Sequence, residues 1–388
     1  MTKNKYIVKS LTPWMMDELK TFSSLVNFDL ILLRNPEEFY KENLNQLELN
    51  DVKIYIEPFA YNFLLKKLVI ILKFFFSNLF KFDFGYNTII GIKSMFWFFR
   101  MNLNLFSKES NIHAQFATQP ALVSLLIKKY YLNQPLFSFT FHAYDIYFNN
   151  KWFEVLVKNC YWAFSISNYN IEYVNNKFIK SDKFILSRLG VFRDTIHKEN
   201  RNDSDYFTLG LMSWFWEKKG IGYLLEAFRV LKVNGFENIK LKLAGDGPLK
   251  NKFTSFIEEN DLSSNIELIG KIKGQEKDEF YNSLDVFVLP SIELKNDQDG
   301  IPVVLMEAIA YSLPIISTNV SGIPEICIND YNGKLIEERN AQKIADSILE
   351  IYNNKENLIE YSKNSYTMSK KYDIEINSKI KISNLNWR

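Results

Sequence analysis

The sequence has few of the residues that build disulfide frameworks, thiolate metal sites or histidine-rich centres. Its 388 residues include only two cysteines, Cys160 and Cys327, and three histidines. The cysteines stand far apart and show no metal or redox spacing, so we expect buried free thiols in a reducing compartment. This pattern excludes a small secreted domain held together by disulfide bonds.

Long hydrophobic runs are also missing. No uninterrupted apolar stretch approaches the roughly 20 residues that a membrane-spanning helix needs. The first residues, 1–6, are not followed by an apolar run of signal-peptide length. We therefore expect a cytoplasmic protein, either soluble or peripheral on the inner face of the cytoplasmic membrane.

The composition is that of an ordinary folded protein with many aromatic residues. Apolar residues make up 47% of the chain and aromatic residues 16%, with 33 phenylalanines, so disorder is not indicated. The length predicts two or three domains.

The net charge of +2 is the sum of two halves of opposite sign. Residues 1–195 hold 23 Lys/Arg and 16 Asp/Glu, whereas the remainder holds 24 and 29. In the basic half, the patch 58–107 combines six Lys/Arg and fifteen aromatic residues with a single acid, Asp83. Two interpretations stay open: helices lying in the interface of an anionic membrane, or core helices with lysines at their rims. No nucleic-acid recognition signature accompanies the patch, so we expect no nucleic acid partner.

The second half alternates between strand-like and helix-like segments. We predict strands at 209–213, 239–244, 265–270, 285–290 and 314–318, with helices over 221–231, 248–260 and 275–284 between them. The first half is less regular, with predicted strands at 6–8, 30–33, around 112, 137–140 and 184–186. This order is typical of doubly wound parallel sheets.

Two acidic residues flank a Gly-Ile-Pro turn after the strand 285–290. Asp299 precedes Pro302, which is well placed to open a helix, and Glu307 lies in the second turn of that helix. The loop at the carboxyl end of a parallel strand is the usual ligand site of such a unit, and a helix N-terminus suits a phosphate. A phosphate on the backbone and hydroxyl groups on two carboxylates describe a nucleotide sugar.

These residues resemble those of the family 4 glycosyltransferases, which are retaining enzymes of the GT-B fold. The family usually has Glu where this chain has Asp299. The resemblance rests on an ordered set of segments: Thr140 to Tyr147, Glu217 to Ile221, Leu243 to Leu249, Asp299 to Ala308, Ser321 to Glu325, and Asn332 with Gly333. Within the family, the chain is most similar to enzymes that build bacterial surface polysaccharides of the exopolysaccharide or colanic-acid type.

The resemblance implies an α/β protein with two Rossmann-like, doubly wound domains facing a central cleft. The N-terminal domain, 1–197, would bind the acceptor, and a linker, 198–206, would lead to the donor-binding domain, 207–360. A helical tail, 361–388, would return to the first domain.

The resemblance also assigns roles to residues. Glu307 would bind the ribose hydroxyls of the donor, Asp299 the hydroxyls of its sugar, and Lys219 the leaving diphosphate. His142 would contribute a hydrogen bond near the transferred sugar. The remaining donor-binding positions are backbone sites: Gly245, Gly247, Gly300 and Ile301. The implied donor is a UDP- or GDP-linked sugar used without a cofactor, and the acceptor is a glycan or lipid-linked glycan.

Retention is compatible with two mechanisms: a covalent sugar–enzyme intermediate, or attack from the same face with the departing phosphate as base. No carboxylate stands out as a nucleophile, so we favour the second. Asp297-Gln298-Asp299 also permits a metal site of the Asp-x-Asp kind, although the following Gly-Ile-Pro turn fits sugar contact better.

The chain departs from the family near the phosphate loop. Trp214 stands where the family usually has an arginine that binds the diphosphate, and Lys218 or Arg193 are the candidate substitutes. This departure keeps a second hypothesis open, a catalytically inactive GT-B protein that partners an active glycosyltransferase. A third, a nucleotide-sugar epimerase of the same fold, finds no matching acid–base motif.

Overall fold

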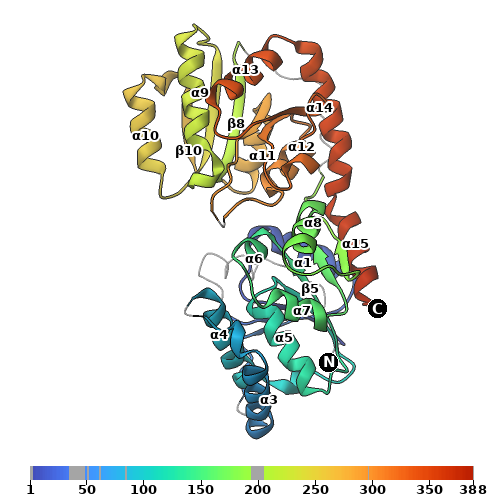
Figure 1. Cartoon of the computed structure of the whole chain (residues 1–388). Helices are drawn as coiled ribbons and strands as arrows, with labels where there is room; N and C mark the ends of the chain where they lie inside the picture. The colour runs from blue at the N-terminus through green and yellow to red at the C-terminus, as the bar shows by residue number, and fades with distance from the viewer. Residues whose placement is uncertain are drawn as a thin grey trace. The chain divides into compact units, whose positions relative to one another are not determined.

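The computed structural model divides the chain into two compact units (Figure 1). The first comprises Met1–Leu189 together with Ile374–Arg388, and the second comprises Gly190–Asp373. The structure describes residues 3–34, 49, 52–60, 63–83, 85–193, 205–295 and 297–387. The predicted linker, 198–206, therefore lies almost entirely outside the described residues.

The described part of the first unit contains a seven-stranded parallel sheet in the order β3-β2-β1-β4-β5-β6-β7. Its strands are β1 (Asn4–Val8), β2 (Asp29–Leu32), β3 (Lys53–Ile56), β4 (Asn111–Gln115), β5 (Leu136–Phe141), β6 (Ala163–Ser165) and β7 (Phe184–Leu186). The helices are α1 (Pro13–Leu25), α3 (Leu64–Ser77), α4 (Tyr86–Arg100), α5 (Gln119–Tyr130), α6 (Ala143–Tyr147), α7 (Phe153–Asn159), α8 (Asn168–Lys177) and α15 (Ile374–Leu385). Short 3-10 turns, η1 (Leu79–Lys81) and η2 (Leu103–Leu105), flank α4.

Both faces of this sheet are covered by apolar side chains, as doubly wound folds require. Successive residues of β1 alternate between the faces: Ile7 belongs to a core that includes residues of α4, α5 and α7, whereas Tyr6 and Val8 belong to a second core with α1. The two-residue period of a strand therefore produces two cores from one sheet.

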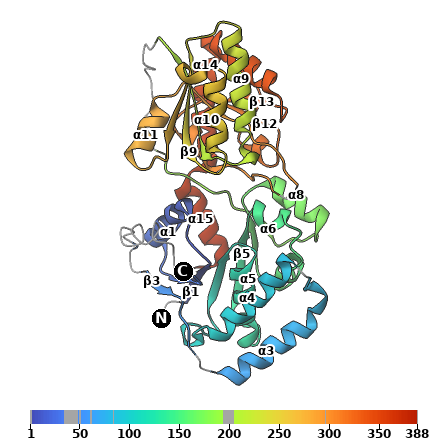
Figure 2. The ribbon, with the colours of Figure 1, turned by 90° about the vertical axis from the view of Figure 1, so that its left-hand side faces the viewer.

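The last helix, α15, packs in the first unit although it follows the whole of the second in sequence (Figure 2). The Lys381 ammonium donates to Glu18 Oε1 of α1 at 2.6 Å, and both side chains are buried. Just beyond α15, the ring of Trp387 stacks on Phe28 with centroids 5.8 Å apart.

The described part of the second unit contains a six-stranded parallel sheet in the order β10-β9-β8-β11-β12-β13. Its strands are β8 (Phe207–Trp214), β9 (Ile239–Asp246), β10 (Ile266–Gly270), β11 (Val286–Leu289), β12 (Ile315–Thr318) and β13 (Gly333–Ile336). The α-helices are α9 (Ile221–Val233), α10 (Lys250–Glu259), α11 (Gln275–Asn282), α12 (Val303–Ala310), α13 (Ala341–Tyr352) and α14 (Lys355–Ser369). The 3-10 turns are η3 (Glu217–Lys219), η4 (Leu262–Ser264), η5 (Ile323–Glu325) and η6 (Lys370–Tyr372).

The strand order of the second unit reverses at β8. From β8 the chain adds β9 and then β10 on one side, and it returns to add β11, β12 and β13 on the other. At such a switch point the loops that follow the two central strands diverge to opposite faces, and ligands of open α/β sheets bind there. The loops after β8 and β11 are therefore the first place to look for a site.

The predicted strands and helices of the second half are all present, with ends displaced by one or two residues. Pro302 directly precedes α12, which begins at Val303, rather than occupying its first position. The sequence analysis did not predict β3, β6 or β13, each of which has only three or four residues. In the described residues, no helix combines the length and apolarity needed to cross a membrane.

The helix α3, in the centre of the patch 58–107, packs on the core with one side only. Its buried residues are Lys67 and Phe74, whereas its leucines are mostly exposed, up to 78% for Leu65. The neighbouring α4 does bury apolar residues, among them Ile90 and Phe98. Of the two interpretations of the patch, the core-helix interpretation therefore holds for α4, whereas α3 combines a core-facing side with Ile70, Ile71, Phe74 and Phe75 and an exposed apolar side.

Candidate functional site

Two loops of the second unit, one after β8 and one after β11, pack directly on each other. The Ile292 N–H donates to the Lys218 carbonyl at 2.8 Å. Gly220 has φ +66°, and a Cβ at this position would lie 1.8 Å from the Pro290 carbonyl oxygen. A side chain is therefore excluded both by the backbone conformation and by the contact. This packing places η3, which carries two lysines, beside the loop that carries two aspartates.

Lys219 and Asp299 form the more buried ion pair of these loops. The Lys219 ammonium lies 2.9 Å from Asp299 Oδ1 and 2.8 Å from Oδ2, and the Ser291 hydroxyl donates to Oδ2 at 2.9 Å. Burial alone would raise the pKa of the Asp299 carboxyl, but the ammonium groups of Lys219 and Lys218 outweigh it and hold the pKa below its ordinary value. Asp299 is therefore an ionised, fixed acceptor.

Lys218 lies beside this pair. Its ammonium is 2.7 Å from Asp297 Oδ1 and 3.6 Å from Asp299 Oδ1. Arg193, the other candidate for the missing arginine, donates instead to the Ser369 hydroxyl at 2.9 Å and lies over the ring of Tyr366. Of the two candidates, only Lys218 contacts the aspartates of the loop after β11.

Glu307 is held by two donors from α11. The Lys277 ammonium lies 2.6 Å from Oε1, and the Tyr281 hydroxyl donates to Oε2 at 2.7 Å. Burial, and then the charge of Glu307, raise the pKa of Tyr281 well above its ordinary value, so this phenol stays a donor. The Tyr281 ring stacks on Tyr311 with centroids 4.9 Å apart. The Glu307 side chain remains 15% exposed, so the carboxylate is held in position and is still accessible to solvent.

Two glycines, one near the end of β9 and one just beyond it, bring the backbone close to β8 and to the loop that follows β8. Gly245 and Gly247 have φ +141° and +154°, and Cβ atoms there would lie 1.9 Å from the Ser213 carbonyl oxygen and 2.6 Å from that of Phe215. Both positions therefore need glycine. Gly300 and Ile301 precede α12; Gly300 is partly exposed, whereas Ile301 is buried.

The predicted residues of the second unit lie at the end of β9, in η3, in the loop after β11 and on α12. Lys219 and Asp299 are in contact, Glu307 is on α12, and the glycine turn follows β9 next to β8. Asp297 and Asp299 are each paired with a lysine, and in the part of the chain that the structure describes no group of three or more His, Cys, Asp or Glu could hold a metal ion.

His142 belongs to the first unit, at the carboxyl end of β5. Its ring is buried against Trp14 and Phe116, with centroids 5.2 and 4.7 Å away. The side-chain amide nitrogen of Gln115 donates to His142 Nε2 at 3.0 Å, and the Asp145 carboxylate accepts from the His142 backbone N–H at 2.9 Å. The loop is therefore held by both its side chains and its backbone.

Burial shifts the pKa values of two side chains in this loop, His142 and Asp145. Burial, and then the Lys381 ammonium, lower the pKa of His142 to about 3, so the imidazole is neutral at physiological pH. Burial raises the pKa of Asp145 to about 7, against the backbone hydrogen bonds from His142 and Ala117 that favour the charged form. His142 can therefore serve as a neutral hydrogen-bonding group but not as a cation.

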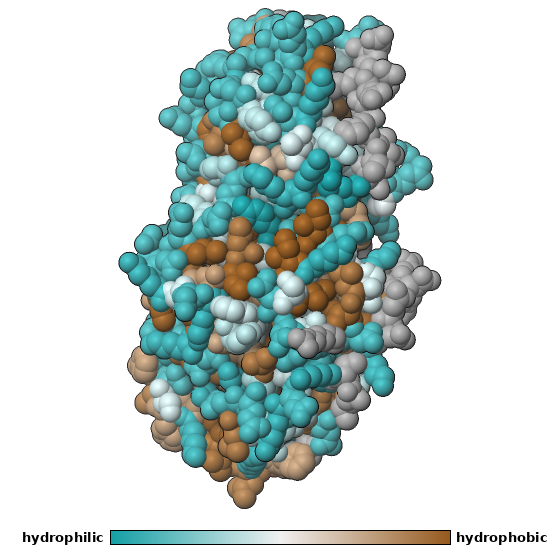
Figure 3. All heavy atoms as spheres, turned by 90° about the vertical axis from the view of Figure 1, so that its right-hand side faces the viewer, coloured by the Kyte–Doolittle hydropathy of each residue, from teal (hydrophilic) through white to brown (hydrophobic). Residues whose placement is uncertain are grey.

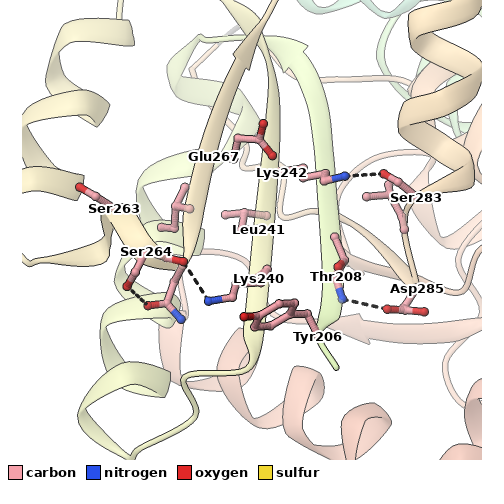
Figure 4. A pocket seen from close by; sticks show the side chains of 13 residues that line it. Tyr206, Thr208, Lys240, Leu241, Lys242, Ser263, Ser264, Glu267, Ser283 and Asp285 are labelled. Atoms are coloured by element: carbon pink, nitrogen blue, oxygen red, sulfur yellow. Dashed lines mark hydrogen bonds between the residues drawn. The ribbon is translucent and has the colours of Figure 1, made fainter. Parts of the chain in front are cut away.

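A separate cavity of about 690 Å³ lies elsewhere in the second unit, towards the amino ends of its strands (Figure 4). None of the predicted site residues lines it. Its polar groups largely satisfy one another through three hydrogen bonds: Lys240 to the Ser264 carbonyl, Lys242 to the Ser283 hydroxyl, and the Thr208 N–H to Asp285. These groups are already paired, and we assign the cavity no part in the candidate site.

Comparison with known proteins finds similarity to glycosyltransferases in the second unit. Residues 192–368 match the family model described as glycosyl transferases group 1, and this segment lies within the second unit. The amylovoran biosynthesis glycosyltransferase AmsK of Erwinia amylovora is 33% identical over 182 residues, which cover 44% of this chain and 42% of that protein. The putative colanic acid biosynthesis glycosyltransferase WcaL of Salmonella typhimurium is 34% identical over 171 residues, covering 44% and 42%.

A comparison of structures covers the whole chain. Anabaena Alr3699/HepE, solved in complex with UDP and glucose, has a TM-score of 0.71 at 13% identity, with 100% of both chains covered. The fold is GT-B. This confirms the predicted fold class, and the relatives confirm the resemblance to polysaccharide glycosyltransferases for the matched segment. The chain spans about half, or less, of the length of these curated relatives.

Several residues of the site were not singled out from the sequence. Ser291 follows β11 by two residues, and its place after a buried strand was an available signal. Lys277 and Tyr281 stand four residues apart on α11, a spacing that puts both on one helix face. Gln115 ends β4 and pairs in register with Thr140, so a correct strand register would have placed it near His142.

The packing of Gly220 on Pro290 predicts a specific loss of stability. Gly220→Ala adds a Cβ 1.8 Å from a carbonyl oxygen, whereas Gly235→Ala, also at positive φ (+83°), meets nothing within 4 Å. We expect Gly235→Ala to cost about 1–2 kcal/mol from backbone conformation and Gly220→Ala to cost about 1–3 kcal/mol more. Denaturant unfolding of both variants measures the difference, and equal losses would contradict the close contact.

The buried state of His142 predicts a dependence of stability on pH. With the pKa at about 3 in the folded chain and near 6.5 in the unfolded chain, the unfolded chain binds more protons between these values. Stability should fall as pH drops through this window, by up to about 1.4 kcal/mol per pH unit from this group. In His142→Gln the contribution is absent, so urea unfolding at pH 7, 6 and 5 should favour the variant increasingly. Parallel pH curves would show that His142 is not buried as described.

Proposed function

We propose that the chain is a retaining glycosyltransferase of family 4 that moves a sugar from a nucleotide-diphosphate sugar to a lipid-linked or growing surface glycan. The observation that supports this most is the contact of Lys219 with Asp299 in the loops after β8 and β11, with Glu307 on the helix that follows, within the segment that matches glycosyltransferases. Relatives named for amylovoran and colanic acid biosynthesis support polysaccharide as the product class.

The donor would bind to the second unit. Glu307 has both oxygens fixed by Lys277 and Tyr281, and each oxygen keeps a second lone pair that can accept from a ribose hydroxyl. Asp299, held ionised by Lys219, would accept from hydroxyls of the transferred sugar. The backbone of Gly245, Gly247, Gly300 and Ile301 would approach the diphosphate and sugar. UDP and GDP sugars are the expected donors.

Catalysis would come from charge and position rather than from a covalent intermediate. The leaving diphosphate gains negative charge as its bond to the sugar breaks, and the Lys219 ammonium stabilises that charge. The departing oxygen can then take the proton of the acceptor hydroxyl on the same face, which retains the configuration. His142, neutral because it is buried, would supply a hydrogen bond to the sugar. No metal or cofactor has a part in this scheme.

The donor site predicts the effect of two substitutions. Glu307→Gln and Lys219→Met should each reduce sugar transfer by about a hundredfold or more, because each removes a charge that stabilises bound donor or leaving group. The matched controls are Glu279→Gln and Lys252→Met, which change exposed residues of α11 and α10. Transfer is measured as nucleoside diphosphate released with a lipid-linked glycan acceptor, and the anomeric configuration of the product is read by NMR.

Thermal shift with UDP, GDP and their sugar conjugates gives an independent measure of donor binding. Stabilisation of the wild type that survives EDTA, and is lost in Glu307→Gln, agrees with a metal-free donor site. Wild-type transfer by either site variant would contradict the assignment. If no nucleotide stabilises the wild type, the alternative of a catalytically inactive GT-B partner is the better description.

The expected peripheral location rests on α3 and η1 of the first unit. We propose that this surface, which we call the α3 surface, docks on an anionic bilayer. Its exposed apolar residues are Phe63, Leu64, Leu65, Leu68, Val69, Leu72, Phe76, Leu79 and Phe80. Brown surface also gathers at the lowest part of Figure 3, at the height where both ribbon views draw α3. Soluble proteins rarely expose so many neighbouring apolar side chains without a partner.

The charges around this surface suit anionic headgroups. Residues 64–77 include Lys66 and Lys73, both exposed, and no acidic residue. The third lysine, Lys67, is buried and donates to the carbonyl oxygens of Ala60, Phe99 and Met101 at 3.2, 2.9 and 2.8 Å. Lys67 thereby fixes α3 against the end of α4 with its apolar side outward.

The α3 surface predicts lipid-dependent sedimentation. Wild type should bind vesicles containing phosphatidylglycerol more tightly than pure phosphatidylcholine vesicles, by about fivefold for each lysine near the surface. Leu65→Glu with Phe76→Glu should abolish binding, because two carboxylates would enter the apolar layer. The control pair is Val233→Glu with Ile359→Glu, which are exposed residues of the second unit. Wild type that stays in solution with either vesicle, or equal loss in both pairs, would contradict membrane docking.

A further inference from the structure

The two lysine–aspartate pairs of the candidate site differ in burial. The side chains of Lys219 and Asp299 are 16% and 10% exposed, and Asp299 has a further donor in Ser291. Those of Lys218 and Asp297 are 23% and 32% exposed, with one contact of 2.7 Å between them. Partly exposed ion pairs stabilise a protein little, because water competes for both charges. The Lys218–Asp297 pair is therefore the one that another anion can break.

Backbone hydrogen bonds hold the chain on both sides of this pair. Lys218 could therefore leave Asp297 for another anion by side-chain movement alone. The Lys218 carbonyl accepts from the Ile292 N–H. The Gly220 N–H donates to the Glu217 backbone carbonyl at 3.0 Å and closes the turn η3. Asp297 and Leu294 exchange two backbone hydrogen bonds of 3.1 and 3.2 Å. The Lys218 ammonium already lies between Asp297 and Asp299, which shows the range over which it can act.

The charges of the four side chains cancel. Two ammonium groups face two carboxylates, one of which, Asp299, is buried and tied to Lys219. A diphosphate that entered this neutral group would meet no net attraction while Lys218 stayed on Asp297. It would gain a cation if Lys218 turned from Asp297 to a phosphate oxygen, and the solvent-accessible Asp297 could then be hydrated.

This inference rests on the proposed donor site. We propose that Lys218 is a second cation for the donor's diphosphate and that Asp297 competes with that diphosphate for it. Asp297 thereby lowers the affinity for the donor and for the nucleoside diphosphate product, which favours product release. The role is opposite in sign to that of a metal-binding aspartate, which would raise affinity.

Calorimetric titration with UDP, GDP and inorganic pyrophosphate in EDTA tests whether Asp297 lowers or raises the affinity for a diphosphate. Asp297→Asn frees Lys218 and removes a negative charge, so we expect each diphosphate to bind about two- to tenfold more tightly. Lys218→Met should weaken binding about tenfold, and Lys218→Arg should restore most of it, since a charged donor is regained. The matched control is Asp330→Asn. Asp330 lies just before β13 and forms a salt bridge with Lys334 of that strand, and its loss should leave the affinity for each diphosphate unchanged.

Three results would overturn the inference. Unchanged or weaker binding by Asp297→Asn, with wild type binding normally, would refute the competition and leave the donor site standing. If wild type binds more tightly with Mg²⁺ in place of EDTA and Asp297→Asn does not, Asp297 is a metal ligand and the inference is wrong. If neither wild type nor variants bind any diphosphate, the proposed function fails and the inference fails with it.

Discussion

The candidate site depends on the contact between the loops after β8 and β11. Because the Gly220 backbone touches the Pro290 carbonyl and the Lys218 carbonyl accepts from Ile292, two segments about 70 residues apart in sequence are held in contact. The adjacency of β8 and β11 in the sheet makes this contact possible, and the absence of a side chain at Gly220 lets it form. The Lys219–Asp299 pair and the placement of α12 follow from it.

The same lysines stabilise the unliganded loops and suit the ligand. A buried carboxylate such as Asp299 would be costly without a partner, and Lys219 offsets that cost. Glu307 has the same arrangement with Lys277 and Tyr281. The proposed anionic donor would therefore have to bind where cations are already paired. This favours a site with one strong and one weak ion pair. The strong pair, Lys219–Asp299, fixes the Asp299 carboxylate, and in the weak pair Lys218 can leave Asp297 for another anion.

Local pattern was sufficient to predict most of the second unit and insufficient for parts of the first. The strand β11 is a fully buried apolar run and β9 alternates buried apolar with partly buried residues, so both patterns identify strands between clear helices. The edge strand β3 is largely exposed and β6 has three residues, so neither shows a pattern. The roles proposed for Asp299 and Glu307 rest on resemblance, whereas their partners Ser291, Lys277 and Tyr281 depend on long-range packing that no local pattern records.

The orientation of α3 could not be predicted from local pattern either, because it depends on the long-range contacts of one residue, Lys67. Its sequence fits a core helix and a membrane-surface helix equally, because composition does not say which face is inward. Lys67 decides it: three carbonyl oxygens, two of them at the end of α4, bind its ammonium inside the unit. Burial lowers its pKa only to about 8, so the cation persists and the carbonyls stay paired. Once that charge is inside, the geometry of a helix directs Leu65, Leu68 and Leu72 outward.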